Sequence, residues 1–195
     1  MKGKFITIEG IDGSGKTTIA ELIYKKIGKD AVLTSEPTKT WLGDAVNKAL
    51  EGKMDAITVA LLFMADRSEH VKKIKKWIAE GKIVICDRYI DSTFAYQSIH
   101  MEIEDAEKWI YKVHEPFLLK PDLTFLLKIS PEKAIERINK RKLILYERTD
   151  FLEKVQKKYM EIAEKENRFV IIDAEKSKEE IVNECFNILK KKRII

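Results

Sequence analysis

Short apolar runs of strand length recur along the chain, and more polar segments separate them. Four runs are strongly apolar and a fifth is weaker; they are Phe5–Ile8, Ile83–Cys86, Leu123–Leu127 and Phe169–Ile172, with Ala31–Leu33 as the weaker one. Uninterrupted runs of this length are typical of strands that are buried on both faces of a parallel sheet.

The segments between these runs are long enough for helices. The expected helices are Lys16–Ile27, Ala56–Ile78, Ile103–Val113, Pro131–Arg141, Phe151–Glu166 and Lys178–Lys191. Because strands and helices alternate, we expect a three-layer α/β fold, with a five-stranded parallel sheet flanked by helices. A length of 195 residues with 45% hydrophobic content suits a single domain over residues 1–195.

Charge and cysteine content narrow the function only a little. The net charge of +5 suits nucleic acid or a small polyanion such as ATP. Cys86 and Cys185 have neither disulfide nor metal-ligand spacing, so we expect buried thiols. No stretch approaches the roughly 20 apolar residues of a membrane helix. Residues 1–4 lead into the first strand without a signal-peptide pattern, so we expect a cytoplasmic protein.

A phosphate-binding loop connects the first expected strand and helix. The run Gly10-Ile11-Asp12-Gly13-Ser14-Gly15-Lys16-Thr17 fits the pattern G-x-x-x-x-G-K-[ST]. The glycines let backbone N–H groups turn toward phosphates, and the helix N-terminus adds positive potential. Lys16 can reach the β and γ oxygens of ATP, and the Thr17 hydroxyl can bind Mg²⁺. We therefore predict a P-loop NTPase fold that binds ATP-Mg²⁺ through Gly10, Asp12, Gly13, Ser14, Gly15, Lys16, Thr17 and Thr18.

Asp87 and Arg88 follow directly after the run Ile83–Cys86, at the carboxyl end of the expected sheet. Open α/β folds bind their ligands at this edge. A carboxylate there can hold Mg²⁺ together with Thr17, and a guanidinium can bind the acceptor phosphate or the transferring group. The alternative is a capping Asp followed by a surface Arg. We predict that Lys16, Asp87 and Arg88 take part in phosphoryl transfer.

These motifs, taken together, resemble those of thymidylate kinases over nearly the whole chain. Glu9–Thr18, Glu36-Pro37, Leu62–Arg67 and Asp87–Tyr89 occur in the order of that family, and Ala95–Gln97 and Phe151–Val155 extend the match. The resemblance implies that ATP-Mg²⁺ phosphorylates dTMP to dTDP, for dTTP synthesis, and that the protein is a homodimer. Another (deoxy)nucleoside monophosphate is the alternative acceptor.

Phe63 and Arg67 are four residues apart in an expected helix, so they project from one face. A ring there can stack on a base and a guanidinium can hydrogen-bond to it, although Phe63 is equally suited to the core. In the family, the corresponding Phe stacks on thymine and the Arg contacts the thymine O4 edge. The resemblance favours the base site.

A further polar segment, Ser92–Gln97, is expected to complete the acceptor site. If Ser92 caps a helix, Thr93 and Gln97 present polar groups together at i and i+4; a capped helix with a half-buried Tyr96 is the alternative. The resemblance implies that Thr93 contacts the thymine N3 edge, that the Tyr96 ring lies against the sugar, and that Asp12 contacts the 3′-hydroxyl.

By the same resemblance, Glu36 organises water and Mg²⁺ around the acceptor phosphate. The loop departs from the commoner family pattern here, with Ser35 before Glu36 and Thr38-Lys39 after Pro37. Many members have Arg at the first of these positions and Gly-Gly at the others. Lys39 is a candidate to supply the missing charge.

A basic stretch after the fourth run is placed like the lid of nucleoside monophosphate kinases, over about residues 137–148. It contains Arg137, Lys140, Arg141, Lys142 and Arg148. Thymidylate kinases carry a catalytic Arg in the P-loop or in the lid, and this P-loop has none. The resemblance therefore implies a lid Arg, Arg141 first and Arg148 second, with Arg148 also near ATP. A solvated basic helix face is the alternative.

Two other function classes fit less well. A GTPase would need a separate Asp-x-x-Gly and an Asn-Lys-x-Asp base reader, and residues 139–142 lack the Asp. A nucleic-acid-binding protein is indicated only by the basic charge, and no recognition motif accompanies it. His70, His100 and His114 show no paired ligand spacing, and we assign them no role. We expect ATP and dTMP as partners, with no nucleic acid and no membrane.

Overall fold

The computed structural model describes residues 3–138 and 145–195. Its centre is a parallel sheet with strand order β2-β3-β1-β4-β5. The strands are β1 (Lys4–Glu9), β2 (Ala31–Ser35), β3 (Ile83–Asp87), β4 (Leu123–Lys128) and β5 (Phe169–Asp173). All five apolar runs therefore form strands, the weak one included, and the predicted fold class is confirmed.

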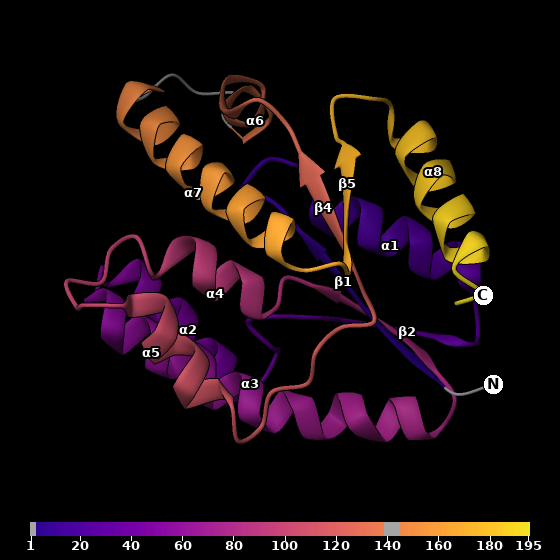
Figure 1. Cartoon of the computed structure of the whole chain (residues 1–195), viewed down its shortest axis with the longest axis horizontal. Coiled ribbons are helices and arrows are strands. Elements are labelled where there is room, and N and C mark those ends of the chain that lie inside the picture. The colour runs from indigo at the N-terminus through magenta and orange to yellow at the C-terminus, as the bar shows by residue number, and fades with distance from the viewer. Residues whose placement is uncertain (1–2, 139–144) are drawn as a thin grey trace.

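Helices cover both faces of this sheet (Figure 1). They are α1 (Lys16–Ile27), α2 (Trp41–Glu51), α3 (Ala56–Ala79), α4 (Ile90–Tyr96), α5 (Ala106–His114), α6 (Pro131–Ile138), α7 (Leu145–Lys165) and α8 (Lys178–Lys191). Helix α1 packs against α8, α2 against α3, and α4 against α7. No helix in the described ranges is long and apolar enough to cross a membrane.

Burial on both faces explains why the strands are continuously apolar. Ile6 and Ile85 belong to one apolar cluster together with Ile19 of α1. Their neighbours along the strands, Phe5 and Val84, belong to a second cluster that includes residues of α3. Successive side chains of a strand point to opposite faces, so each β1 and β3 residue meets a helix on its own side.

Several predicted helix boundaries need correction. Helix α2 was not expected, and α7 begins at Leu145 rather than Phe151, so it includes part of the expected lid. Ser92 is not a helix cap: α4 begins at Ile90 with Tyr89 at the N-cap position. Ser92 is instead buried within the first turn, where its hydroxyl donates to a carboxylate of β1.

The strand register brings three chain segments to one edge of the sheet. Asp87 at the end of β3 is paired with Ile8 of β1 and with Ser35 of β2. The P-loop, the Glu36-Pro37 loop and the Asp87-Arg88 turn therefore leave the sheet side by side. Ligands of open α/β sheets bind at this edge, and the predicted residues of the P-loop, Glu36, Asp87 and Arg88 meet there.

Candidate active site

The P-loop wraps from β1 into α1 with the backbone conformations its glycines permit. Gly13 and Gly15 have φ of 82° and 93°, which L side chains rarely adopt. A Cβ at Gly13 would lie 2.2 Å from the carbonyl oxygen of Ala134, so α6 closes one side of the loop. The loop can therefore present its backbone N–H groups only with glycine at this position.

Lys16 is buried in the loop, and its ammonium group donates to the Ile11 carbonyl at 2.7 Å. Burial, and then the positive charge of Arg88, lower the pKa of Lys16 to about 7. Anionic phosphates beside the ammonium would favour its charged form. The geometry suits a lysine that gains its full charge when a nucleotide occupies the loop.

Thr17 and Asp87 form a pair of oxygen ligands at the end of β3. The Thr17 hydroxyl donates to Asp87 Oδ2 at 2.5 Å. The other oxygen, Asp87 Oδ1, is buried and has no hydrogen-bond partner among the described residues. Hard oxygen atoms of this kind are the ligands that Mg²⁺ prefers, and one or two protein ligands suffice when phosphates supply the rest.

Arg88 has the left-handed backbone conformation, with φ of 65°, directly after the strand. Its guanidinium pairs with the Asp12 carboxylate, donates to Ser92 Oγ at 3.3 Å, and lies 5.2 Å from the centre of the Tyr96 ring. Non-glycine residues with this backbone conformation are uncommon and cluster at functional sites. Three side chains thus direct one guanidinium toward the P-loop.

Tyr96 is tied to the same loop through its phenol oxygen. The backbone N–H of Asp12 donates to Tyr96 Oη at 2.9 Å. Burial raises the pKa of Tyr96 to about 12, so the phenol stays neutral. The ring meets Phe151 and Tyr159 of α7 edge-on, at 5.9 and 6.4 Å between centres. The predicted sugar-site residue therefore connects the P-loop with the helix that follows the lid.

Glu9 underlies this arrangement, and its role was not predicted from the sequence. Its Oε1 accepts the backbone N–H of Tyr89 at 2.8 Å, and its Oε2 accepts the hydroxyls of Ser92 and Tyr159 at 2.7 and 2.9 Å. The carboxyl is wholly buried. Burial, and then the nearby charge of Asp91, raise the pKa of Glu9 from its ordinary value of 4.5 to about 7.

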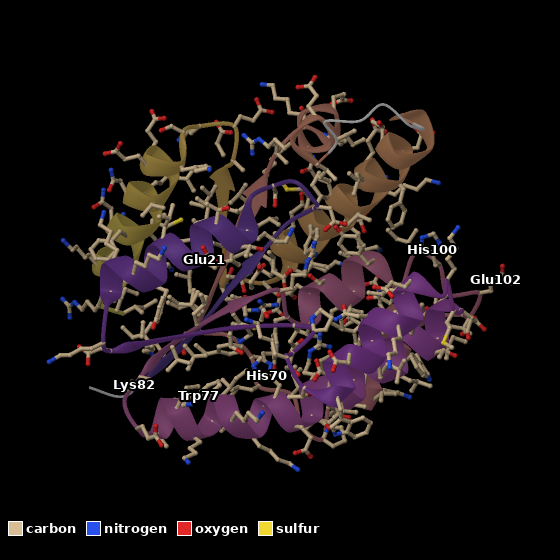
Figure 2. All side chains as sticks on the ribbon, turned by 180° about the vertical axis from the view of Figure 1, so that it is seen from behind. Glu21, His70, Trp77, Lys82, His100 and Glu102 are labelled. Carbon is tan, nitrogen blue, oxygen red and sulfur yellow. The ribbon has the colours of Figure 1, made fainter. Side chains whose placement is uncertain are left out.

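Two clefts open at this edge of the sheet. The first, of about 830 Å³, is lined by P-loop residues 12–19, by Arg88 and Arg137, and by the β5–α8 connection. The second, of about 600 Å³, is lined by the β2–α2 loop, by residues of α1 and α3, and by Asp87. In Figure 2, Glu21 on α1 and His70 and Trp77 on α3 border the second cleft. Thr17 and Arg88 line both clefts, which therefore meet at these residues.

The β2–α2 loop is shaped by Glu36 and Asp66. Glu36 is buried, follows β2 and precedes Pro37 through a cis peptide bond. The backbone N–H and the hydroxyl of Thr38 donate to the two oxygens of Asp66 at 2.7 and 2.5 Å. The threonine side chain thus fixes the loop, while the exposed Lys39 lines the second cleft.

The predicted base-site residues are close together, but they do not line the second cleft. Phe63 is half-buried on α3. Arg67 and Thr93 are each only 1% exposed, and the guanidinium donates to Thr93 Oγ1 at 3.1 Å. Gln97 is half-buried at the C-cap of α4, one turn beyond Thr93. Two of the polar side chains expected at the base, Arg67 and Thr93, are therefore bonded to each other.

Two histidines without an expected role contact these residues. His70 Nδ1 lies 2.9 Å from Glu36 Oε1, and His114 Nε2 lies 2.6 Å from Nη1 of Arg67. Both histidines therefore have structural partners in the site, although they lack the spacing of metal ligands. The available signal was the helical spacing of Ile110 and His114, which places the histidine on the buried face of α5.

The predicted lid arginines are not located by the structure. Arg141 lies outside the described residues. Arg148 lies in the first turn of α7, but its side chain is outside the described part of the chain. Arg137, at the start of the expected lid, lines the first cleft and donates to the Ala174 carbonyl at 2.9 Å.

A P-loop at the end of a parallel sheet, with a second cleft that meets it at an arginine, defines the class of P-loop phosphotransferases. Comparison with known proteins specifies the family: the sequence model of the thymidylate kinase family matches residues 8–185. The chain belongs to the thymidylate kinase family. The predictions of family, fold class and dTMP kinase activity with ATP as phosphate donor are thereby confirmed.

Individual relatives agree with this membership over nearly the whole chain. A probable thymidylate kinase of Methanocaldococcus jannaschii is 45% identical over 188 residues, which cover 95% of each chain. Probable thymidylate kinases of Methanococcoides burtonii and Sulfolobus acidocaldarius are each 44% identical. The first comparison covers 93% of each chain, and the second covers 94% of this chain and 95% of the relative.

The titration of Glu9 makes stability depend on pH. Because the pKa of Glu9 is raised in the folded protein, this group binds more protons in the folded state between pH 4.5 and about 7, and its contribution to the free energy of unfolding falls as pH rises through that window. A shift of this size corresponds to roughly 3 kcal/mol. We expect Glu9→Gln to remove most of this fall, as measured by urea unfolding at pH 5 and pH 8.

The exposed Glu69, which pairs with Lys72 on the surface of α3, provides the control. Glu69→Gln should leave the difference between the two pH values as in the wild type. An equal difference in wild type and Glu9→Gln would contradict the raised pKa.

Proposed function

We propose that the protein transfers the γ-phosphoryl group of ATP to the phosphate of dTMP where its two clefts meet. ATP would occupy the P-loop cleft, and the dTMP phosphate would enter the second cleft. The observation that carries this assignment is that Thr17 and Arg88 line both clefts. Two reactants held on either side of one guanidinium can react by direct in-line transfer, which requires mainly positioning and charge stabilisation.

In the proposed step, an oxygen of the dTMP phosphate forms a bond to the γ-phosphorus. The bond from that phosphorus to the β–γ bridging oxygen breaks, and ADP and dTDP result. Lys16 and the P-loop N–H groups bind the β and γ oxygens, and Arg88 binds the group in transfer. Asp12 and Tyr96 keep Arg88 oriented. No covalent enzyme intermediate is needed.

Mg²⁺ belongs to this proposal, with Thr17 and Asp87 as its protein ligands. The buried Asp87 Oδ1, which has no hydrogen-bond partner among the described residues, supports this assignment. When bound, the ion neutralises charge on the phosphate oxygens. The catalytic lid arginine, Arg141 or Arg148, is proposed on the family resemblance alone. A cytoplasmic location also remains part of the proposal.

For the acceptor site, we propose that Phe63 stacks on thymine and that Arg67 and Thr93 contact its O4 and N3 edges. Ser92 and Gln97 complete this wall of the site. Asp12 and Tyr96 would contact the deoxyribose, and Glu36 would organise solvent at the acceptor phosphate. Support comes from the position of Phe63 and Arg67 on successive turns of α3, with Arg67 bonded to Thr93.

A coupled assay of ADP release with separate acceptors tests the function. We expect strong turnover with dTMP and weak turnover with dCMP, dAMP, dGMP, UMP and thymidine; dUMP measures the tolerance for a missing methyl group. Lys16→Ala should lower kcat by about a hundredfold or more, because a preorganised cation on the transferring group is lost. Its thermal melt should stay close to that of the wild type. Near wild-type activity in Lys16→Ala would contradict the proposed phosphoryl transfer at the P-loop.

The base site can be tested separately through Phe63. Replacing a stacking ring by Ala removes roughly 1–3 kcal/mol of base binding. We expect Phe63→Ala to raise the KM for dTMP about tenfold with little change in kcat or in the KM for ATP. An unchanged KM for dTMP would assign Phe63 to the core instead.

We also propose a homodimer. The helix pair α2–α3 and its connection carry large exposed apolar side chains, which supports a protein interface on this part of the fold; they are Trp41, Leu50, Met54 and Leu61. We expect Leu61→Glu to shift the wild-type dimer toward monomer in sedimentation velocity. Ile171→Glu, which alters an exposed apolar residue of β5, should leave the dimer intact. A wild-type monomer at all concentrations would contradict the proposal.

A further inference from the structure

The Arg67 guanidinium is fixed by three residues from different parts of the fold. Its Nε donates to Glu36 Oε2 at 2.8 Å, its Nη2 donates to Thr93 at 3.1 Å, and its Nη1 lies 2.6 Å from His114 Nε2. All four side chains are buried. The orientation of this guanidinium is therefore a property of the folded protein, set before any acceptor binds.

The contact with His114 has one chemically consistent interpretation. A guanidinium only donates hydrogen bonds, so His114 Nε2 must be the acceptor and carry no proton. The other ring nitrogen, Nδ1, then carries the proton and donates to the Ile110 carbonyl at 2.7 Å. The i−4 carbonyl of α5 thus selects the tautomer that Arg67 requires.

The surroundings keep this imidazole neutral. Burial, and then the positive charge of Arg67, lower the pKa of His114 to about 3. The ring also packs against Phe117, with 5.4 Å between the ring centres. His114 therefore acts as a fixed acceptor throughout the neutral pH range.

The contact with His114 occupies one of the two hydrogens of Nη1 and fixes the direction of the other. Nη1 carries two hydrogens, and His114 is its one partner among the described residues. A second N–H directed at a substrate base finds a partner in a keto oxygen, whereas an amino group there would place donor against donor. Discrimination of this kind is strong because a buried donor is otherwise left unpaired.

We propose that His114 is the positioning residue for Arg67, and that it enables Arg67 to select acceptors with a 4-keto pyrimidine over those with a 4-amino pyrimidine. The inference rests on the proposed function, because it assumes that Arg67 reaches the base. His114 itself does not touch the substrate; it acts by holding Nη1.

Two substitutions separate the acceptor nitrogen from the shape of the ring. His114→Phe keeps a planar ring but removes the acceptor, and His114→Gln provides an amide oxygen at a similar distance from the backbone. We expect His114→Phe to raise the KM for dTMP about tenfold, as for loss of a hydrogen bond to a charged group, with kcat and the KM for ATP within about twofold. His114→Gln should recover most of the affinity for dTMP.

A substrate without the 4-oxygen provides the sharper measurement. The 4-deoxo analogue of dTMP should show a higher KM than dTMP in the wild type, and this ratio should shrink in His114→Phe and persist in His114→Gln. The preference for dTMP over dCMP should also weaken in His114→Phe. A merely structural histidine would change stability but leave these ratios unchanged.

The matched control is His100→Phe, because His100 stacks on Phe151 at 4.9 Å between ring centres and is exposed. Figure 2 shows His100 near Glu102, apart from His70. Folding is checked by thermal melts and by ATP binding; if His114→Phe does not fold, His114→Leu is compared with His114→Gln instead. Ratios equal to those of the wild type in a folded variant would overturn the inference, as would His114→Gln behaving like His114→Phe. Wild-type turnover with dTMP tests the proposed function separately.

Discussion

The proposed acceptor side of the site depends on one buried ion pair. Glu36 Oε2 and Arg67 Nη2 lie 2.6 Å apart, and both side chains are 1% exposed. Removing two charges from water is costly, and their attraction compensates only when the remaining polar atoms also find partners. His70 binds the other oxygen of Glu36, while Thr93 and His114 bind the guanidinium. The polar partners of this single ion pair therefore fix four elements relative to one another: the end of β2 and helices α3, α4 and α5.

A second buried carboxylate, that of Glu9, connects several elements on the other side of β3. Glu9 ends β1 as Glu36 follows β2, and it gathers the Tyr89 backbone, Ser92 and Tyr159. Helix α4 is shared by the two networks, since Ser92 belongs to one and Thr93 to the other. Asp91, which precedes Ser92 in the same helix, accepts two hydrogen bonds of 2.8 and 2.7 Å from Arg168. This short helix is consequently positioned from three directions, which allows Tyr96 at its end to hold the P-loop.

The sequence was sufficient for features that depend on local pattern, and insufficient for those that depend on long-range contacts. The five strands, the P-loop and the boundaries of α1 and α8 follow from apolar runs and a fixed motif. His114 meets Arg67 across 47 residues of sequence, and Glu9 meets Ser92 across 83 residues, so no local spacing reveals either contact. The expected cap at Ser92 was wrong for the same reason, because a carboxylate from β1 takes up its hydroxyl. Helix α2 was missed because its large apolar residues Trp41 and Leu50 are exposed, while its buried face is formed by the smaller residues Gly43, Val46 and Ala49.

The strained conformation of Arg88 connects these networks with the proposed reaction. A left-handed arginine costs of order 1–3 kcal/mol and persists only where its surroundings fix it. Asp12, Ser92 and Tyr96 provide those contacts. Asp12 belongs to the P-loop, Tyr96 is bonded to Asp12, and Ser92 belongs to the Glu9 network. In the proposed reaction, the strained conformation places a cation at the junction of the two clefts, where charge would develop during transfer. Because the guanidinium is already oriented, the proposed transfer would need little reorganisation when the phosphates arrive. This is the condition under which electrostatic stabilisation favours the transition state over the bound substrates.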